Sequence, residues 1–220
     1  MQTGALSFSI VVYDNKGAGY SIIFYMKKYL VEALGTFALT LVVALSLVGD
    51  FPLATPVLAA LTLGLFVYSV GHISGTHINP AVTIGAWSLG KITLSDALLY
   101  IVSQFVGAGI ALAVASSVGF VGAAGPSSVS LGVAELLGTF FFTFGIASVV
   151  YGRVNQTCSG AMVGGSLLLG ITIAVLLGSA GVLNPAVAFG IGSFQLMYIL
   201  GPIIGSVLGM QAYKFVSSEA

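Results

Sequence analysis

Six apolar runs of about 20 residues dominate this chain of 220 residues. A helix of this length crosses the hydrocarbon core of a bilayer, because the core is about 30 Å thick and a helix rises about 1.5 Å per residue. Only 6 Lys plus Arg and 6 Asp plus Glu are present, too little charge to solvate a globular surface. The sequence therefore predicts an all-α membrane protein. The predicted spans cover residues 29–49, 54–72, 96–119, 131–151, 160–178 and 196–216.

Positive charge is distributed regularly around these predicted spans. All 6 Lys and Arg residues fall on one side of the membrane if the chain crosses it six times. Because loops rich in Lys and Arg stay on the cytoplasmic side, we expect both termini in the cytoplasm. The short loops favour a prokaryotic plasma membrane. The cationic residues are Lys16, Lys27, Lys28, Lys91, Arg153 and Lys214.

The two halves of the chain repeat each other. Three pairs of segments recur in the same order, at similar offsets of 103, 105 and 98 residues. A unit of three spans is odd, so the second copy must enter the membrane from the opposite side. Inverted repeats of this kind place a functional site near the membrane midplane, where broken helices meet. The pairs are Glu-x-x-Gly-Thr-Phe at 32–37 and 135–140, Asn-Pro-Ala at 79–81 and 184–186, and Tyr-Ile at 100–101 and 198–199.

The repeats predict how the chain is divided. Repeat one is expected at 26–125 and repeat two at 126–216, together forming one membrane domain, with a C-terminal tail at 217–220. Residues 1–25 have a mixed polar and aromatic character, and the stretch beginning at Met26 resembles a natural protein start. We expect residues 1–25 to be a dispensable extension that is prone to disorder.

Each Asn-Pro-Ala motif has the composition of a helix start. Asparagine is a favoured N-cap, and proline is favoured at the first helical position because its missing N–H would be unsatisfied there anyway. The residues that follow, 82–89 and 187–194, allow about two turns each, which reach only halfway across a bilayer. We therefore expect two re-entrant half-helices. Their starts are formed by Asn79, Pro80, Ala81, Asn184, Pro185 and Ala186.

Glycine-rich backbone leads into both half-helices, at residues 71–78 and 178–183. Irregular backbone at membrane depth is tolerated only where it is buried in protein or lines water. The sequence therefore predicts a water-lined pore, with backbone carbonyl groups accepting hydrogen bonds along one wall. The expected pore-lining loop residues are Gly75, Thr76, His77, Ile78, Ala180, Val182 and Leu183.

Asn79 and Asn184 are expected to meet at the centre of this pore. Each side-chain oxygen can cap its helix while the amide N–H₂ donates to a passing solute. The two half-helix N-termini also direct partial positive charge at the same point, which disfavours cations and protons. The alternative is that both asparagines act only as helix caps.

With these features the sequence resembles the aquaporins of the major intrinsic protein family. The resemblance covers residues 27–216 and rests on both Asn-Pro-Ala motifs, the lead-in at 69–75, the paired Glu-x-x-Gly-Thr-Phe segments and Gln104. It implies a channel of six spans and two half-helices that assembles as a homotetramer, with one pore in each subunit.

Two glutamates lie within predicted spans, where ionisable residues are functional by default. The resemblance implies that Glu32 and Glu135 accept hydrogen bonds from the backbone before each half-helix, with Gln104 as a further structural residue; a proton relay is the alternative. His72 and His77 have no neighbouring carboxylate or cysteine, so we expect them to order the pore loop through ring hydrogen bonds and not to bind a metal. Another alternative is that His77 titrates near neutral pH and thereby gates the cytoplasmic mouth of the pore.

Selectivity is where the sequence departs from water-selective aquaporins. In those relatives the filter has an arginine three residues after the second Asn and a bulky aromatic residue in the second span. Here these positions hold Val187 and Ala59, and the filter position in the loop is Gly181. The position in the fifth span is Leu177 by the helix pattern, which implies a shortened outer loop, or Thr172 by counting back from the second Asn. The valine resembles the plant vacuolar branch of the family.

Loss of the arginine removes a fixed cation and a rigid set of donors, so the predicted filter is wide and weakly polar. We expect a passive channel in a lipid bilayer for water and small neutral solutes such as ammonia, urea, hydrogen peroxide and glycerol. The sequence offers no nucleophile, base and metal-ligand constellation, so an enzyme is not expected, nor a cofactor, a metal or a nucleic-acid partner. A secondary transporter and a structural membrane-junction protein are the alternatives.

Overall fold

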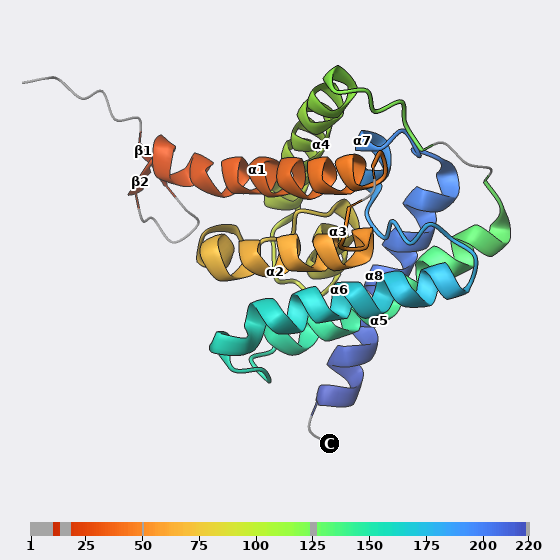
Figure 1. The fold of residues 1–220 in the computed structure, drawn as a ribbon. Coiled ribbons are helices and arrows are strands. Elements are labelled where there is room, and N and C mark those ends of the chain that lie inside the picture. The colour runs from red at the N-terminus through yellow and green to blue at the C-terminus, as the bar shows by residue number, and fades with distance from the viewer. Residues whose placement is uncertain (1–10, 14–18, 50, 124–126, 219–220) are drawn as a thin grey trace, which may run out of the picture.

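Six long helices form the body of the protein in this computed structural model, which describes residues 11–13, 19–49, 51–123 and 127–218. Each of them is long and apolar enough to cross a membrane, as predicted from the sequence. Figure 1 shows them packed in one bundle. The long helices are α1 (Ile22–Ser46), α2 (Thr55–Ser74), α4 (Leu94–Ser117), α5 (Val129–Val150), α6 (Ser159–Leu176) and α8 (Leu196–Ser217).

Two short helices follow the Asn-Pro-Ala motifs. The first, α3, spans Pro80–Ser88, and the second, α7, spans Pro185–Gly190. The second half-helix is shorter than predicted, because the chain enters the left-handed region at Gly192, with φ at 73°. Glycine adopts this conformation without a steric penalty, so the helix stops at Gly190, two residues before it, instead of continuing to residue 194.

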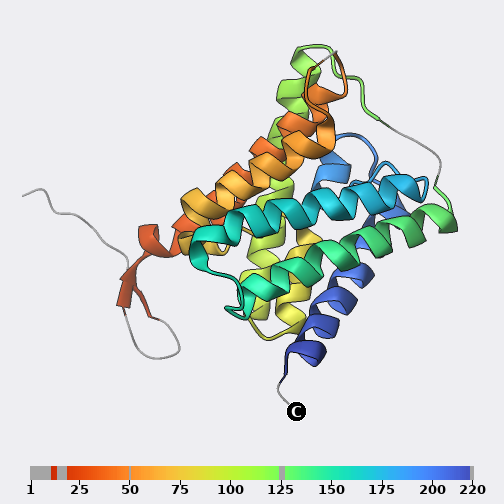
Figure 2. The same ribbon diagram turned by 60° about the horizontal axis from the view of Figure 1, so that its bottom comes forward.

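The packing of the helices follows the inverted repeat. In the first half α1 packs against α2 and α4, and in the second half α5 packs against α6 and α8 in the same way. The halves are joined by α2 on α6, by α3 on α8, and by α7 on both α1 and α4. Figure 2 shows the same bundle from a second direction. Each half-helix therefore packs against a long helix of the opposite repeat.

Glycines allow the closest approaches between the long helices. A Cβ atom at Gly107 would overlap the backbone of Ala33, and one at Gly205 would overlap the backbone of Leu136. Small residues of this kind allow helix backbones in a membrane to approach each other closely. Gly35 has a different neighbour, because a Cβ there would overlap the side chain of Ile78 in the loop before α3.

A short hairpin precedes the bundle. Strands β1 (Val11–Tyr13) and β2 (Gly19–Ser21) pair antiparallel, and α1 then begins at Ile22. Figure 1 shows the hairpin at the start of α1, outside the bundle. The helix thus begins four residues before the predicted boundary at residue 26. The rest of the predicted extension, 1–10 and 14–18, and the end of the predicted tail, 219–220, lie outside the described residues.

Candidate functional site

Asn79 and Asn184 are the N-caps of the two half-helices. The Oδ1 of Asn79 accepts a hydrogen bond from the backbone N–H of Ala81 at 2.9 Å. The Oδ1 of Asn184 accepts from Ala186 at 3.0 Å and from Val187 at 3.3 Å. In each case the next residue, a proline, occupies the first helical position. Both starts therefore have the capping geometry that their composition predicts.

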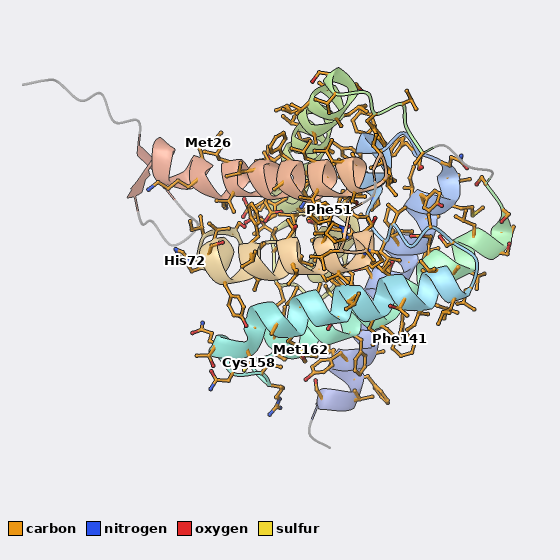
Figure 3. All side chains as sticks on the ribbon, viewed as in Figure 1. Met26, Phe51, His72, Phe141, Cys158 and Met162 are labelled. Atoms are coloured by element: carbon orange, nitrogen blue, oxygen red, sulfur yellow. The ribbon has the colours of Figure 1, made fainter. Side chains whose placement is uncertain are left out.

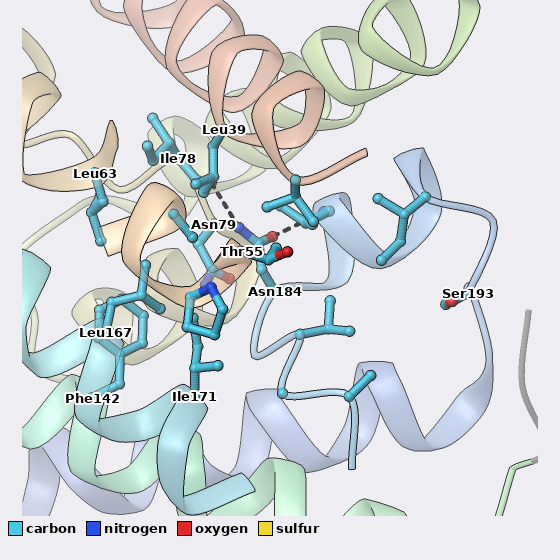
Figure 4. Close-up of a pocket in the computed structure, with 18 of the residues that line it drawn as sticks. Leu39, Thr55, Leu63, Ile78, Asn79, Phe142, Leu167, Ile171, Asn184 and Ser193 are labelled. Carbon is cyan, nitrogen blue, oxygen red and sulfur yellow. Dashed lines mark hydrogen bonds between the residues drawn. The ribbon is translucent and has the colours of Figure 1, made fainter. Parts of the chain in front are cut away.

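The same two asparagines also join the half-helix starts to each other. Nδ2 of Asn79 donates to the carbonyl of Leu183 at 2.9 Å. Nδ2 of Asn184 donates to the carbonyl of Ile78 at 3.0 Å, a bond drawn in Figure 4. An amide N–H₂ has two protons, and each of these bonds uses one. Among the described residues no partner takes the second proton, which leaves one donor on each asparagine for a solute.

The carbonyls that accept these bonds belong to residues with strained backbone. Ile78 has φ at 38° and Leu183 has φ at 53°, in the left-handed region. Such a conformation costs about 1–3 kcal/mol for a residue other than glycine and persists only where the surroundings enforce it. Both side chains are fully buried, and each carbonyl is turned to the asparagine of the other repeat.

Glu32 fixes the backbone of the first loop, the segment between α2 and α3. This side chain is fully buried on α1, and one of its oxygens accepts from the hydroxyl of Ser74 at 2.7 Å and the backbone N–H of His77 at 2.9 Å. The other oxygen accepts from the N–H of Ile78 at 2.6 Å and from Nε2 of Gln104 at 2.8 Å. A carboxylate is a strong acceptor for several donors, which compensates for its burial and for the strain at Ile78.

Glu135 fixes the backbone of the second loop, the segment between α6 and α7, in the same way. It is fully buried on α5 and accepts from the hydroxyl of Ser179 and from the backbone N–H groups of Val182 at 3.0 Å and Leu183 at 2.7 Å. The serines Ser74 and Ser179 were missed at the sequence level. They are separated by 105 residues, the same offset as the two Asn-Pro-Ala motifs, and that signal could have identified them.

A central cavity of about 170 Å³ is lined in part by the two asparagines (Figure 4). Its wall is mostly aliphatic and aromatic, and no Asp, Glu, Lys or Arg lines it among the described residues. A polar solute therefore meets few hydrogen-bonding groups, which include both asparagine amides. Apolar lining residues include Leu39, Val43, Leu63, Phe142, Leu167 and Ile191, and the polar side chains are those of Thr55, His77, Asn79, Asn184 and Ser193.

Three of the four predicted filter residues line this cavity. They are Ala59, which is 4% exposed, Val187, which is 3% exposed, and Gly181. Ala59 comes from α2, Gly181 from the second loop and Val187 from the first turn of α7. They surround the cavity from three elements, and none of them brings a polar side chain to its wall.

The prediction of a filter residue in the fifth span is wrong, because neither Leu177 nor the alternative, Thr172, lines the cavity. Leu177 lies just past the end of α6 with half of its surface exposed, and Thr172 is exposed with its hydroxyl bonded to the carbonyl of Leu168. The helix instead presents Ile171 and Leu167 to the cavity. These residues are four apart and so share a face of α6, whereas a neighbour in sequence is turned about 100° away.

The remaining loop residues divide between two spaces. Gly75 and Thr76 line a second space of about 500 Å³, which we call the inner vestibule. Ile78, Ala180 and Val182 line the central cavity. Leu183 contributes its carbonyl to Asn79, as described above. The prolines and alanines of the two motifs, Pro80, Ala81, Pro185 and Ala186, are buried in the first turns of α3 and α7.

His72 does not support the pore loop, contrary to the prediction. It is exposed near the end of α2, at the same end of the long helices as Met26 and Cys158 (Figure 3). Ser74, two residues further along, faces the interior and binds Glu32. Gln104, by contrast, is fully buried and binds both Glu32 and Thr83, a residue that sequence reasoning also missed.

Comparison with known proteins gives relatives that match most of this chain. The sequence profile described as Major intrinsic protein matches residues 20–213. The chain is 34% identical over 219 residues to the glycerol uptake facilitator protein-like 6 of Lactiplantibacillus plantarum, covering 88% of this chain and 100% of that protein. It is 31% identical over 182 residues to the aquaporin AqpM of Methanothermobacter marburgensis, covering 70% of this chain and 72% of that protein.

A solved structure supports the same fold. The aquaglyceroporin from Plasmodium falciparum, determined by X-ray crystallography, superposes with a TM-score of 0.63 at 22% identity, over 86% of this chain and 93% of that one. Six membrane-capable helices, paired half-helices and the profile match agree with one another. The chain is a multi-pass membrane channel for water, small solutes or both, it is not an enzyme, and it belongs to the major intrinsic protein family.

Proposed function

We propose that this channel passes water together with small neutral solutes, namely ammonia, urea, hydrogen peroxide and glycerol, and that it excludes ions and protons. The observation that carries the proposal is the uncharged wall of the central cavity. A neutral solute loses little hydration there and binds weakly enough to leave, whereas an ion loses its hydration without a compensating charge.

Ion exclusion is attributed to the centre of the pore. The N-termini of α3 and α7 both point at the two asparagines, so partial positive charge from both helices converges on this place. Glu32 and Glu135 are fully buried and bound to backbone N–H groups of the two loops, and neither lines the central cavity. The asparagine amides supply donors, which favours solute oxygens and repels cations and protons.

Solute size is proposed to be set at the outer side, by Ala59, Ile171, Gly181 and Val187. All four line the central cavity, and their side chains are small or aliphatic. An arginine at residue 187 would fill space and offer five fixed donors to one solute. With valine there, the filter is wide enough for glycerol and urea and has no fixed cation.

The membrane orientation is proposed from the place of the cationic side chains in the fold. Lys28 forms an ion pair with Asp96 at 2.9 Å, and Lys91 lies 4.7 Å from the centre of the Tyr151 ring. Arg153 donates to the carbonyl of Ser217 at 3.5 Å. These residues connect the helix ends of both repeats on the side of the inner vestibule, which the positive-inside rule makes cytoplasmic. We further propose that the channel is a homotetramer in a prokaryotic plasma membrane, with both termini of each subunit in the cytoplasm.

An osmotic assay on purified protein in liposomes tests the channel against the two other classes. Light scattering after an osmotic step should show fast shrinkage that does not saturate with solute concentration. Saturable flux and counterflow would instead indicate a secondary transporter. Absence of flux together with clustering of the vesicles would indicate a membrane-junction protein.

A further inference from the structure

The connection between α4 and α5 returns to the central cavity. We call the part of it that the structure describes before α5, residues 118–123, the outer strap. Helix α4 starts beside the inner vestibule, which Thr93 lines, and runs for 24 residues, about 36 Å, before the strap begins. The strap therefore lies at the end of the bundle away from the vestibule. Its last residue, Ala123, is exposed and lines the central cavity.

Two hydrogen bonds, which we call the clasp, fasten Ala123 to the chain that follows α7. The N–H of Ala123 donates to the carbonyl of Ile191 at 2.8 Å, and the hydroxyl of Ser193 donates to the carbonyl of Ala123 at 2.6 Å. Ser193 is buried and also lines the cavity (Figure 4). Because a carbonyl can only accept, the single proton of the Ser193 hydroxyl is committed to this bond. The clasp thus engages both backbone polar groups of Ala123.

Two glycines let the strap and the chain after α7 come together. Gly122 has φ at 90° and Gly192 has φ at 73°, in the left-handed region that glycine adopts without a steric penalty. A Cβ atom at Gly192 would lie 3.3 Å from the Cα atom of Gly122, which is tighter than an ordinary side-chain contact. The two backbones are therefore in direct contact beside the clasp.

The clasp is attached close to Val187. The N–H of Ile191 donates to the carbonyl of Val187 at 2.9 Å, so the clasp begins about one helical turn beyond that residue. Ala123, Ile191 and Val187 all line the same cavity. A solute that enters the cavity from the end of the strap therefore meets Ala123 and Ser193 before it reaches Val187.

The other half-helix has an equivalent at the opposite end of the pore. Both α3 and α7 end in a turn in which a glycine with positive φ is followed by a polar residue, Lys91 after α3 and Ser193 after α7. Lys91 lines the inner vestibule and lies over the Tyr151 ring of the second repeat. Ser193 reaches Ala123 of the first repeat. The end of each half-helix therefore ties one end of the pore to the opposite repeat.

The strap has a second anchor, of a different kind. Phe120 is buried and belongs to the hydrophobic core that also contains Val187 and Ile191. Val121, the next residue, is 97% exposed and is not one of the described residues that line the cavity. Apolar packing thus holds the start of the strap, whereas the clasp holds Ala123 at its far end. Loss of the clasp should release Ala123 without unfolding the rest of the strap.

We propose that the outer strap is a second size barrier of the pore and that Ser193 is its positioning residue. The clasp holds Ala123 in the cavity wall, where it narrows the way to Val187. Water passes this place more easily than a bulkier polyol or amide such as glycerol or urea. This role rests on the proposed channel function and adds to it a place, separate from the filter, at which solutes are sorted by size.

Cysteine labelling tests whether the strap borders the path of the solute. The single cysteine is removed by Cys158→Ser, and Ala123→Cys or Val121→Cys is then added to the full chain in liposomes. A methanethiosulfonate reagent attaches a bulky group, and mass spectrometry measures the extent of labelling. We expect labelled Ala123→Cys to lose glycerol permeability by about tenfold and labelled Val121→Cys, the matched control, to keep it. An unreactive Ala123→Cys, no loss after its labelling, or an equal loss in both variants overturns the proposal.

Ser193→Ala and Ser193→Thr test the positioning role. Alanine removes the hydroxyl that binds Ala123, whereas threonine keeps it, and gel filtration verifies that both variants are folded. We expect the ratio of glycerol to water permeability to rise in Ser193→Ala, by up to about fivefold because one neutral hydrogen bond holds this end of the strap. The ratio should stay at the parent value in Ser193→Thr. Labelling of Ala123→Cys should also block glycerol less when Ser193→Ala is present.

A serine with a merely structural role predicts lower thermal stability in Ser193→Ala with an unchanged permeability ratio. An unchanged or lower ratio in Ser193→Ala, or an equal rise in Ser193→Thr, therefore overturns the role of Ser193. A parent protein that passes neither water nor glycerol contradicts the channel function itself.

Discussion

Nδ2 of Asn79 lies 2.9 Å from the carbonyl oxygen of Leu183, the residue directly before Asn184. Asn184 returns an equivalent bond to Ile78 at 3.0 Å. Each asparagine thus caps its own half-helix through Oδ1 and fixes the start of the other through Nδ2. The two halves of the chain are joined at the pore centre by these reciprocal bonds, so the centre is a structural element as well as a place where solutes pass.

Asn184→Asp should destabilise the protein although it keeps the capping oxygen. Aspartate has no N–H to give to Ile78 and places a negative charge against that carbonyl. We expect a loss of about 1–3 kcal/mol, the cost of leaving a buried partner unsatisfied, seen as a lower temperature of thermal unfolding in detergent. Asn155→Asp is the matched control, because Asn155 also accepts a capping bond, from Thr157 at 3.0 Å, but on the exposed surface. An equal loss in both variants would contradict the structural role of the reciprocal asparagine bonds.

Glu32→Gln should destabilise more than removal of a surface charge. Both oxygens of Glu32 accept hydrogen bonds, but the amide nitrogen of a glutamine cannot accept. We therefore expect the variant to lose at least one hydrogen bond to a charged acceptor, at a cost of about 1.5–3 kcal/mol. Asp96→Asn is the comparison, since its ion pair with Lys28 is partly exposed and such pairs contribute about 0–1 kcal/mol. The fraction of protein that remains folded after heating measures both. A smaller effect for Glu32→Gln than for Asp96→Asn would argue against the scaffold role.

Val187→Arg should narrow the filter and restrict larger solutes. We expect glycerol and urea permeability to fall by about tenfold, equivalent to about 1.4 kcal/mol in the barrier, with a smaller effect on water. Val187→Leu adds bulk without charge and so separates size from electrostatics. Solute and water fluxes in liposomes give the comparison. Equal solute-to-water ratios in Val187→Arg and the parent protein would count against residue 187 as part of the filter.

Ile171→Phe tests which face of α6 lines the pore. Phenylalanine there enters the central cavity, so glycerol permeability should fall several-fold. Thr172→Phe and Leu177→Phe place the same side chain on exposed positions outside the cavity, and glycerol permeability should stay close to that of the parent protein. A fall in Thr172→Phe or Leu177→Phe with no effect of Ile171→Phe would show that α6 has a different rotation.

Sequence patterns sufficed where local chemistry decides the structure. The length of the apolar runs predicted the six spans. The Asn-Pro pairs predicted the starts of α3 and α7, because capping depends on neighbouring residues alone. The duplicated Glu-x-x-Gly-Thr-Phe segments indicated two buried glutamates. Their contacts with the loops came from the resemblance to a family and agree with the observed hydrogen bonds of Glu32 and Glu135.

Features that depend on helix rotation and tertiary packing could not be read from the sequence. Ile171 and Leu177 are both apolar residues near the end of one span, and only the packing of α6 determines which faces the cavity. His72 and Ser74 are two residues apart, and the end of α2 turns one outward and the other onto Glu32. Thr83 accepts a hydrogen bond from Gln104 on another helix, a contact that no local pattern contains.

The most direct test of the uncharged pore is the volume of liposomes containing the parent protein after steps of glycerol, urea or potassium chloride. The vesicles should shrink rapidly in all three solutions, then swell again in glycerol and in urea as the solute enters, and stay shrunken in potassium chloride. Swelling in potassium chloride, or permanent shrinkage in both glycerol and urea, would contradict a pore that admits small neutral solutes and excludes ions.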